Sequence, residues 1–444
     1  MIFALTAVTA AQVFTYIGYV IVALLALMVM IVVHELGHYT AGKLLGFKID
    51  EFGIGFGPAI FKKTNKKNGE VFSLRIFPIG GFCAFHGEDA EENKLDEDGN
   101  PILGEDGKPI KDAEAFNAQK PWKRLIVLFS GAFMNFLSAI FIITIYFSAY
   151  GQILPTVINT HDEAQVIVGA QQNQFQNGDV ILSINGKQVN VLLQEDLDKA
   201  FAKLGDSAKF KVLRNGKRIT INASKYYYSP FTDGEYVYSI NGVQLETAVP
   251  YQDLGTVEAA DTNDPLTLVL VTYDTDGNVV SQSTAVVQRG KVAEDPTGYY
   301  GYGFGITRTI TRAKLPFFLA FGRSFGFCFF VVFKILASLG ALITGKIGLE
   351  NAGGTITTIT TIAKMSSLGF DSFLYVTAII SANLAVMNWL PFPALDGSRM
   401  LFTLIEMIFR KPVPRKVEAI IHTVGLVLLI VLAVFLDIFH LVKA

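Results

Sequence analysis

The chemistry that the sequence offers is concentrated in one short stretch, His34-Glu35-Leu36-Gly37-His38. Residues four apart on a helix share one face, about 6 Å apart along the axis. Two imidazoles in that arrangement can hold one Zn²⁺, and a neighbouring carboxylate can handle a proton. The alternative is a chance pair of histidines at a helix end. Three grouped ionisable residues argue against chance, because each costs about 2.5–3.5 kcal/mol inside a membrane segment.

The element that positions this stretch is a long apolar run. No Asp, Glu, Lys, Arg or His occurs among residues 1–33, which is enough chain to cross a bilayer. The run lacks the basic start of a secretory signal, and the first basic residue is Lys43. The positive-inside rule therefore predicts a first spanning helix near residues 13–38, with its histidines near the cytoplasmic end.

The bulk composition agrees with a membrane protein that carries soluble parts. Of the 444 residues, 51% are hydrophobic and 17% are charged, which is too apolar for an ordinary soluble enzyme. The net charge of −2 argues against a nucleic-acid partner. The two cysteines, Cys83 and Cys328, are far apart, so we expect neither a disulfide nor a cysteine metal site.

A catalytic zinc site needs a third protein ligand, and Asp396 is the candidate. It follows a span near residues 372–395, and basic residues come after it, which indicates the cytoplasmic side. Both this span and the first one run from outside to inside, so His34, His38 and Asp396 reach a similar depth. Two histidines and one carboxylate leave a coordination position open, as in catalytic sites. Alone, Asp396 would be interpreted as a helix-end carboxylate in an Asp-Gly turn.

Two segments between these motifs have their own patterns. Residues 52–82 alternate apolar residues with glycines, which predicts short strands and turns. A second span opens at Trp122 and contains Asn135. A buried amide there fits helix packing and an active-site position equally well.

Residues 153–306 are polar, alternate between apolar and polar residues as strands do, and contain an internal repeat. Each copy has a strand closed by an Asn-Gly turn, at Asn185-Gly186 and at Asn241-Gly242. The first copy resembles a PDZ domain, a module that binds extended peptide ends by strand addition. The second is less complete, and residues 301–309 could supply its closing strand. A β-rich spacer without a ligand is the alternative.

Residues 314–345 are apolar but carry Arg323 and Lys334. A full crossing here would place Asp396 on the wrong side of the membrane. We therefore expect this segment to lie along the outer surface or to dip into it. The last span is expected near residues 417–439.

Together these motifs resemble the site-2 protease family, specifically the bacterial intramembrane zinc metalloproteases of the regulator-of-sigma-E type. The matching pieces cover nearly the whole chain: residues 34–38, the loop ending Gly80-Gly81-Phe82, Asn135, the PDZ-like insert and residues 388–397. Two departures stand out. Ser130-Gly131-Ala132 replaces a more usual Gly-Pro pair, and the second PDZ-like unit is incomplete.

The resemblance implies that Zn²⁺ is bound by His34, His38 and Asp396 and that Glu35 is catalytic. It also implies that residues 52–85 form a membrane-associated sheet. The substrate-binding candidates are Asn383, Asn388, Asn135, Gly80 and Gly81.

The implied function is hydrolysis of a peptide bond within the transmembrane segment of a single-span membrane protein or signal peptide. Trimmed anti-sigma factors and signal-peptide remnants are examples of such substrates in regulated intramembrane proteolysis. The implied location is the bacterial cytoplasmic (inner) membrane, with the lipid bilayer as partner and the PDZ-like region extracytoplasmic. A membrane zinc hydrolase acting on lipid and a non-catalytic PDZ-bearing receptor are the alternatives.

The expected fold is a polytopic α-helical membrane protein with about four transmembrane helices, a membrane-associated β-rich loop and an extracytoplasmic PDZ-like insert. The expected segments are 1–46 (first transmembrane helix with the zinc motif), 47–87 (β-loop), 88–119 (acidic cytoplasmic loop), 120–151 (second transmembrane helix), 152–228 (PDZ-like domain), 229–312 (second, partial PDZ-like unit), 313–370 (interfacial segment), 371–400 (third transmembrane helix with the Asp ligand) and 401–444 (cytoplasmic loop and fourth transmembrane helix).

Overall fold

A computed structural model of the chain forms two compact units, Met1–Ala149 with Phe317–Ala444, and Tyr150–Pro316. The structure describes residues 10–88, 102, 112–158, 174–202, 204–228, 234–250, 266–287, 299–301, 305–306 and 312–443. Most of the predicted acidic loop, 88–119, lies outside the described residues.

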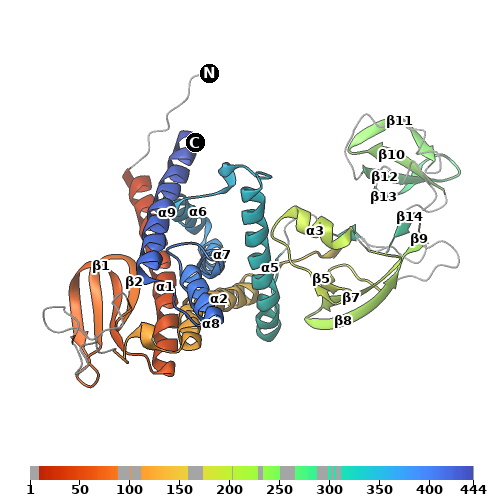
Figure 1. Ribbon diagram of the computed structural model, residues 1–444. Helices are drawn as coiled ribbons and strands as arrows, with labels where there is room; N and C mark the ends of the chain where they lie inside the picture. The colour runs from red at the N-terminus through yellow and green to blue at the C-terminus, as the bar shows by residue number, and fades with distance from the viewer. Residues whose placement is uncertain are drawn as a thin grey trace. The chain divides into compact units, whose positions relative to one another are not determined.

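The first unit consists mainly of helices (Figure 1). Within the described part of the chain, five helices are long and apolar enough to cross a membrane. They are α1 (Ala10–Leu45), α2 (Pro121–Ala149), α5 (Phe317–Ile343), α7 (Phe370–Trp389) and α9 (Arg415–Lys443). Two shorter helices are α6 (Thr355–Leu368) and α8 (Asp396–Phe409). The prediction of a multi-pass α-helical protein is confirmed at this level.

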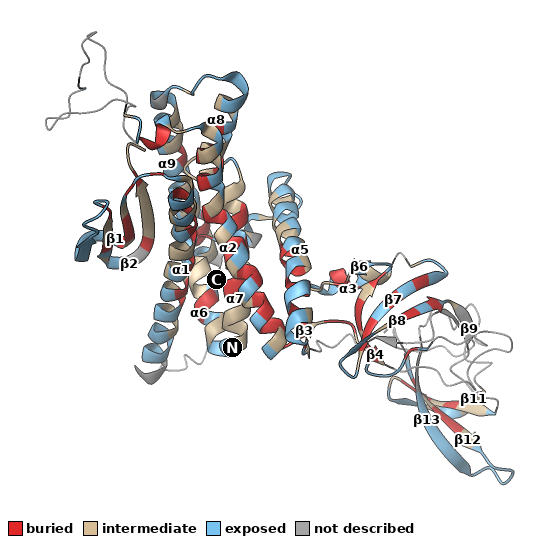
Figure 2. Ribbon diagram, turned by 90° about the horizontal axis from the view of Figure 1, so that it is seen from below, coloured by how far each residue is buried: buried red, intermediate tan, exposed pale blue. Residues whose placement is uncertain are grey.

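Burial differs strongly between these helices (Figure 2). The α1 and α9 helices keep large apolar side chains such as Phe14 and Leu428 exposed, as expected for surfaces that face lipid. The α2 helix buries one side almost continuously, including Val127, Ala132 and Ala139. It packs against α1, α5, α7 and α8, so it is the central helix of this unit.

The segment predicted to be interfacial, 313–370, contains the long helix α5 and the shorter α6. Arg323 and Lys334 both lie within α5. Arg323 is buried, and the Lys334 Nζ lies 5.5 Å from the centre of the Phe330 ring. By length and composition the described residues therefore offer five candidate spans where the sequence predicted about four. The interfacial placement itself stays a prediction.

The chain after α5 lies at the C-terminal end of α9. The carbonyl of Ala352 is 2.7 Å from His440 Nε2, and the Asp437 carboxylate accepts the N–H groups of Ile356 and Thr357 at 3.0 Å each. From that end α6 and then α7 follow. The chain thus returns to the C-terminal end of α9 before α6 and α7 begin. Asp396 follows the far end of α7, so its position does not depend on the direction in which the long helix α5 runs.

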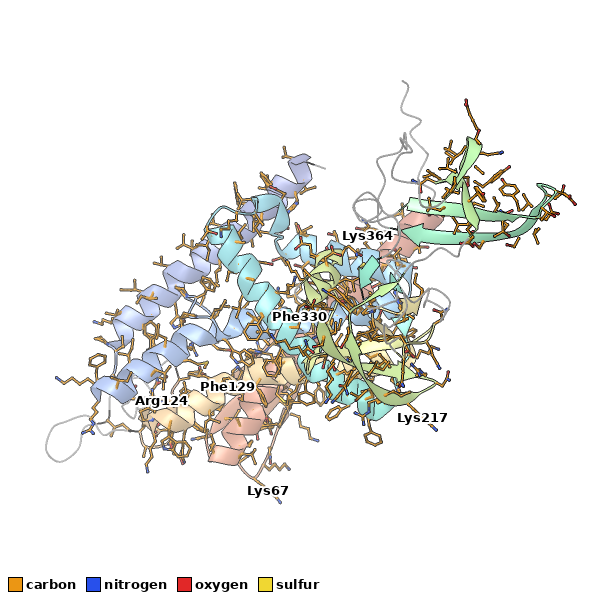
Figure 3. The ribbon with its side chains drawn as sticks, turned by 90° about the vertical axis from the view of Figure 1, so that its right-hand side faces the viewer. Lys67, Arg124, Phe129, Lys217, Phe330 and Lys364 are labelled. Carbon is orange, nitrogen blue, oxygen red and sulfur yellow. The ribbon has the colours of Figure 1, made fainter. Side chains whose placement is uncertain are left out.

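A twisted sheet follows α1. It consists of β1 (Ile49–Thr64) and β2 (Val71–Phe85), as predicted for residues 47–87. Both strands bend, so that Phe52 has Cys83 as register partner on one side and Phe72 on the other. Within the described chain, residues 80–85 have no strand partner beyond β1 and form an edge of this sheet. Lys67, at the turn between the strands, points away from the helices (Figure 3).

The second unit contains two four-stranded sheets with the same strand order. The first, in the order β6-β5-β7-β8, is formed by β5 (Val180–Ile184), β6 (Lys187–Gln188), β7 (Ser207–Arg214) and β8 (Lys217–Ser224), with α3 (Gln194–Phe201) inserted between β6 and β7. The second, in the order β11-β10-β12-β13, is formed by β10 (Glu235–Ile240), β11 (Val243–Pro250), β12 (Leu266–Tyr273) and β13 (Val279–Val287).

The internal repeat of the sequence extends to the turns of the two sheets. Asn185 and Asn241 both have positive φ angles, 48° and 49°, and a glycine with positive φ follows each. The Oδ1 of Asn185 accepts the N–H of Lys209 at 2.8 Å, and the Oδ1 of Asn241 accepts the N–H of Thr267 at 2.7 Å. Each asparagine thus ties its hairpin to the neighbouring strand in the same way.

The predicted closing strand does not close the second sheet. Residues 301–309 are described only at 301, 305 and 306. Here β14 (Tyr299–Gly301) pairs with β9 (Tyr226–Tyr228), and β15 (Gly305–Ile306) pairs with β4 (Val157–Ile158). Both partner strands, β9 and β4, come before the second sheet in the chain. The second sheet is therefore inserted between strands that pair with each other. The internal repeat predicts that the two sheets share similar hairpins. It does not predict which strand the segment near residue 305 pairs with.

Candidate metal centre

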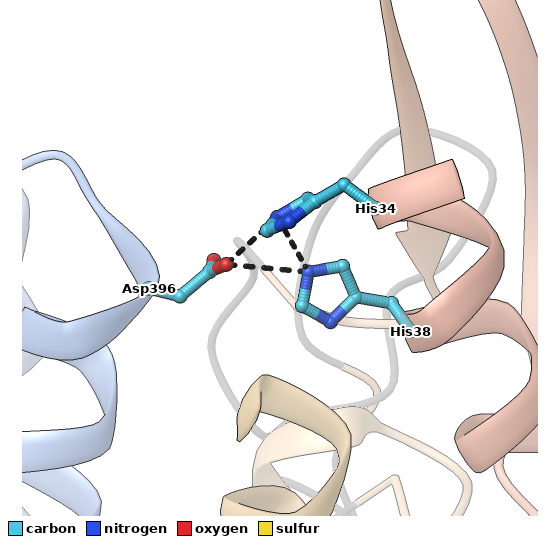
Figure 4. A group of neighbouring side chains, drawn as sticks. All are labelled: His34, His38 and Asp396. Carbon is cyan, nitrogen blue, oxygen red and sulfur yellow. Dashed lines mark hydrogen bonds and ion pairs between the residues drawn. The ribbon is translucent and has the colours of Figure 1, made fainter. Parts of the chain in front are cut away.

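The side chains of His34, His38 and Asp396 converge at one point (Figure 4). The Nε2 atoms of the two histidines are 3.2 Å apart. The Oδ2 atom of Asp396 lies 2.9 Å from His34 Nε2 and 3.3 Å from His38 Nε2. Residues from the first helix and from the last third of the chain therefore form one triangle of potential ligand atoms.

These distances fit a tetrahedral zinc ion. With Zn–N and Zn–O bonds near 2.0–2.1 Å, neighbouring ligand atoms in a tetrahedron are separated by about 3.3 Å. The three edges of the observed triangle, 2.9, 3.2 and 3.3 Å, approach that value. Three ligand atoms of this kind leave a fourth tetrahedral position open for chemistry.

The tautomer of His38 also suits a metal. Its Nδ1 lies 2.8 Å from the carbonyl oxygen of Val127, which can only accept a hydrogen bond. The proton of the neutral ring is therefore on Nδ1, and the Nε2 lone pair faces the other two ligand atoms. A cation between the three atoms would relieve the repulsion between their lone pairs.

Two glycines let α1 and α2 touch at the histidines. A Cβ atom on Gly37 would lie 2.3 Å from the carbonyl oxygen of Ser130, and a Cβ on Gly131 would lie 2.2 Å from His38 Nε2. The Ser130 hydroxyl is 2.9 Å from the Gly37 carbonyl oxygen, to which it donates. The site is thus packed directly against the backbone of α2.

The α7 helix delivers Asp396 from the other side of α2. The Ser381 hydroxyl donates to the carbonyl oxygen of Asn135 at 2.9 Å, and the Trp389 ring stacks on Phe129 at 5.2 Å between centroids. After Trp389 the chain turns, and α8 begins at Asp396. Gly397 permits this turn, because a Cβ there would lie 2.0 Å from the Leu390 carbonyl oxygen.

Glu35 faces the same space as the ligand triangle. It lines a cavity of about 540 Å³ together with His38, Asp396, Arg399 and the end of β2. A Cβ on Gly81 would lie 3.4 Å from Glu35 Cγ, so the edge segment of the sheet packs against this carboxylate. The arrangement places a potential proton acceptor and an open strand edge beside the three ligand atoms.

The predicted substrate-binding residues fall in two places. Gly80 and Gly81 lie on the edge segment, and Gly80 has a φ of 91°, which favours glycine. Asn135 is 1% exposed and lies inside the α2–α7 contact. Asn383 is exposed on α7, and Asn388 is half-buried near its end. None of these three asparagines lines the cavity that contains Glu35.

Sequence reasoning missed several residues around the site. Gly131 was noted only as a departure from a family pattern, and His422 on α9 was not considered at all. His422 was detectable, because a histidine inside an otherwise apolar span is costly and calls for a reason. The close approach at Gly131 had no signal of its own in the sequence.

Comparison with known proteins identifies the family of this chain. The family model of peptidase family M50 matches residues 22–432. A protein of Clostridium perfringens named as a zinc metalloprotease is 28% identical over 426 residues, covering 95% of this chain and 97% of that protein. Similarly named proteins of Campylobacter jejuni and Vibrio cholerae are each 26% identical, covering 91% and 90% of this chain and 88% and 93% of their own lengths.

The family match spans nearly all of the chain, from the first apolar helix to the last. It includes both histidines, Glu35 and Asp396. The chain therefore belongs to peptidase family M50, the site-2 proteases, and is a zinc metalloprotease with several membrane-type helices.

Proposed function

We propose that this protein hydrolyses a peptide bond inside the transmembrane segment of single-span membrane proteins or signal-peptide remnants. The observation that carries the proposal is the ligand triangle of His34, His38 and Asp396 at the meeting point of long apolar helices, with Glu35 and an open strand edge beside it. A site at this depth suits a substrate that itself lies in the membrane.

In this proposal His34, His38 and Asp396 hold the zinc ion. The bound Zn²⁺ would supply a Lewis acid that polarises the scissile carbonyl and makes water a better nucleophile. Glu35 accepts the proton of the attacking water and passes it to the leaving amide nitrogen. Val127 holds His38 in the required tautomer through its carbonyl oxygen, at 2.8 Å from Nδ1.

A transmembrane substrate must unwind before its backbone can be attacked. Its carbonyl groups are engaged in helical hydrogen bonds, and freed groups need new partners inside the membrane. Residues 80–85 offer such partners, because they form a sheet edge that packs against Glu35. The amides of Asn383 and Asn388 are further candidates for holding the unwound segment, and Asn135 supports the helix pair from inside.

The membrane sidedness is part of the same proposal. Arg124 at the start of α2 and Lys411 after α8 indicate the cytoplasmic side of a bacterial inner membrane. The PDZ-like unit, 150–316, is then extracytoplasmic. There it would exclude substrates with a bulky external portion, so that prior trimming of the substrate is required. Trimmed anti-sigma factors belong to this class of substrate.

The deciding experiment uses the full chain, purified in detergent and returned to liposomes with a labelled single-span peptide. Wild-type protein is expected to cut the peptide within its apolar segment, to lose activity with a chelator and to regain it with Zn²⁺. Glu35→Gln is expected to keep the zinc and lose cleavage by about 10²–10⁴-fold. Leu36→Ile, at an exposed neighbouring position, is the matched control.

The same liposomes are assayed for released fatty acids. Lipid hydrolysis without peptide cleavage would replace the protease proposal by a lipid hydrolase. Full cleavage by Glu35→Gln would reject Glu35 as the proton acceptor. Wild-type protein that binds no zinc and cleaves neither substrate would favour the non-catalytic receptor.

A further inference from the structure

The loop that carries Asp396 has a strained backbone immediately before α8. Ala394, two residues before Asp396, has a φ of 71°. This left-handed conformation is unfavourable for alanine and persists where the surroundings enforce it. Any relaxation at Ala394 would swing the start of α8 and displace the carboxylate of Asp396.

His422 on α9 contacts the strained residue directly. Its Nδ1 accepts a hydrogen bond from the backbone N–H of Ala394 at 3.2 Å. Because this nitrogen is the acceptor, the proton of the neutral ring is on Nε2. The ring is also packed edge-on against Phe402 of α8, with 5.9 Å between centroids. His422 thus contacts both the loop and the helix that Asp396 begins.

A second contact between α9 and the loop comes three residues later. A Cβ on Gly425 would lie 2.0 Å from the Cβ of Pro393, so glycine is required for this close approach. Residues three apart lie on the same face of a helix. One face of α9 therefore holds the loop at two consecutive residues, Pro393 by contact and Ala394 by a hydrogen bond.

We propose that His422 is a positioning residue that holds Ala394 in its left-handed conformation and thereby sets the Asp396 carboxylate against the two histidines. The inference rests on the proposed role of Asp396 as a zinc ligand. The effect runs through the backbone, because His422 bonds to the loop and not to the carboxylate. Loss of the acceptor leaves His34 and His38 in place and weakens only the third ligand.

The experiment measures zinc affinity of the full chain in detergent by competition with a chromophoric chelator, together with the visible absorption of the Co²⁺-substituted protein. His422→Leu removes the acceptor and is expected to lower zinc affinity by about 10–100-fold, the usual effect of losing a group that orients a metal ligand. It should also change the Co²⁺ spectrum. His422→Asn keeps an acceptor oxygen near the position of Nδ1 and should retain affinity within about threefold of wild type.

A double variant separates positioning from simple packing. Ala394→Gly adopts a positive φ without strain, so it should leave wild-type affinity unchanged and restore most of the affinity lost in His422→Leu. Val424→Leu, exposed on the same helix, is the matched control and should behave as wild type. If His422→Leu does not fold, His422→Asn alone and Ala394→Gly alone still test the retained acceptor and the strained position.

Three outcomes in the His422 variants would overturn the positioning role. They are wild-type zinc affinity in His422→Leu, equal loss of affinity in His422→Asn and His422→Leu, and no recovery in the double variant. Asp396→Asn is measured in parallel. If it loses zinc affinity while His422→Leu does not, the positioning role fails and the zinc-ligand assignment stands. If Asp396→Asn keeps full affinity, the ligand assignment fails and the inference falls with it.

Discussion

Gly131→Ala should separate metal binding from folding in this protein. The added Cβ would lie 2.2 Å from His38 Nε2, whereas ordinary contact begins at 3.4 Å. The ring must therefore move by about 1 Å, or α2 must shift away from α1. Metal–ligand bonds tolerate deviations of only about 0.2 Å, so His38 would be displaced from the position in which it can bind zinc.

The expected size of the effect follows from this displacement. Weakened binding by one of three ligands should cost at least about 100-fold in zinc affinity, or about 2.7 kcal/mol. The free energy of unfolding should change much less. Overpacking costs about 1–3 kcal/mol, and alanine recovers up to about 1 kcal/mol relative to glycine in a helix. The variant should be folded and poor in zinc.

The assay combines the zinc content of the purified protein, chelator competition and the thermal unfolding midpoint in detergent. Gly18→Ala is the matched control, because a Cβ at this position on α1 meets no atom within 4 Å. It should keep wild-type zinc affinity and an equal or slightly higher midpoint. Full zinc affinity in Gly131→Ala would refute the inference that α2 packs directly against the bound form of His38.

Three further predictions test other parts of the structure. A Cβ on Gly37 would lie 2.3 Å from the backbone of α2. Gly37→Ala should therefore lower both the thermal unfolding midpoint and the zinc content, because the backbones of α1 and α2 must separate. An unchanged unfolding midpoint would contradict this prediction. Burial and the nearby Glu35 carboxylate raise the pKa of the Cys83 thiol. Because the thiolate is the reactive form, Cys83 in a Cys328→Ser variant should react with iodoacetamide at pH 8 at least about tenfold more slowly than free cysteine. The rate should keep rising by about tenfold per pH unit from pH 8 to 10. A rate that levels off near pH 9.5, as an ordinary thiol of pKa about 8.5 requires, would exclude the raised pKa. Arg214→Ala should destabilise the second unit, Tyr150–Pro316, by about 3–5 kcal/mol, because it removes the ion-pair partner of the buried Asp179 carboxylate. This carboxylate accepts hydrogen bonds from Arg214 Nε and Nη2 at 2.7 Å each. Unchanged protease resistance of this unit would argue against the prediction.

The ligand triangle could be predicted because two local rules applied. Helical spacing put His34 and His38 on one face, and charge distribution gave both spans the same direction, so Asp396 could reach them. The Asn-Gly turns at Asn185 and Asn241 were similarly readable, because positive φ angles favour these residues in tight hairpins. Features of this kind follow from residues that are close together in the sequence, or from the direction in which a span crosses the membrane.

Other features depend on which surfaces meet. From the sequence, residues 314–345 are expected on the outer surface, because a full crossing would put Asp396 on the wrong side of the membrane. The structure shows that Phe317–Ile343 form the helix α5, and the interfacial placement stays a prediction. The sequence also suggested that residues 301–309 could supply a closing strand for the second sheet, whereas β15 pairs with β4, which precedes the first sheet of the same unit. The partner strand β4 lies far away along the chain from β15, and local patterning carries no information about it.

The sequence alone determined the zinc chemistry, the membrane character and the paired hairpins of this protein. Only the tertiary structure decided that Gly131 touches His38 and that His422 holds the loop before Asp396. The physical reason is that α1 and α9 are apolar on nearly all sides. A helix without an amphipathic stripe does not reveal from its sequence which face packs against a neighbour, so these contacts become visible only when the helices are brought together.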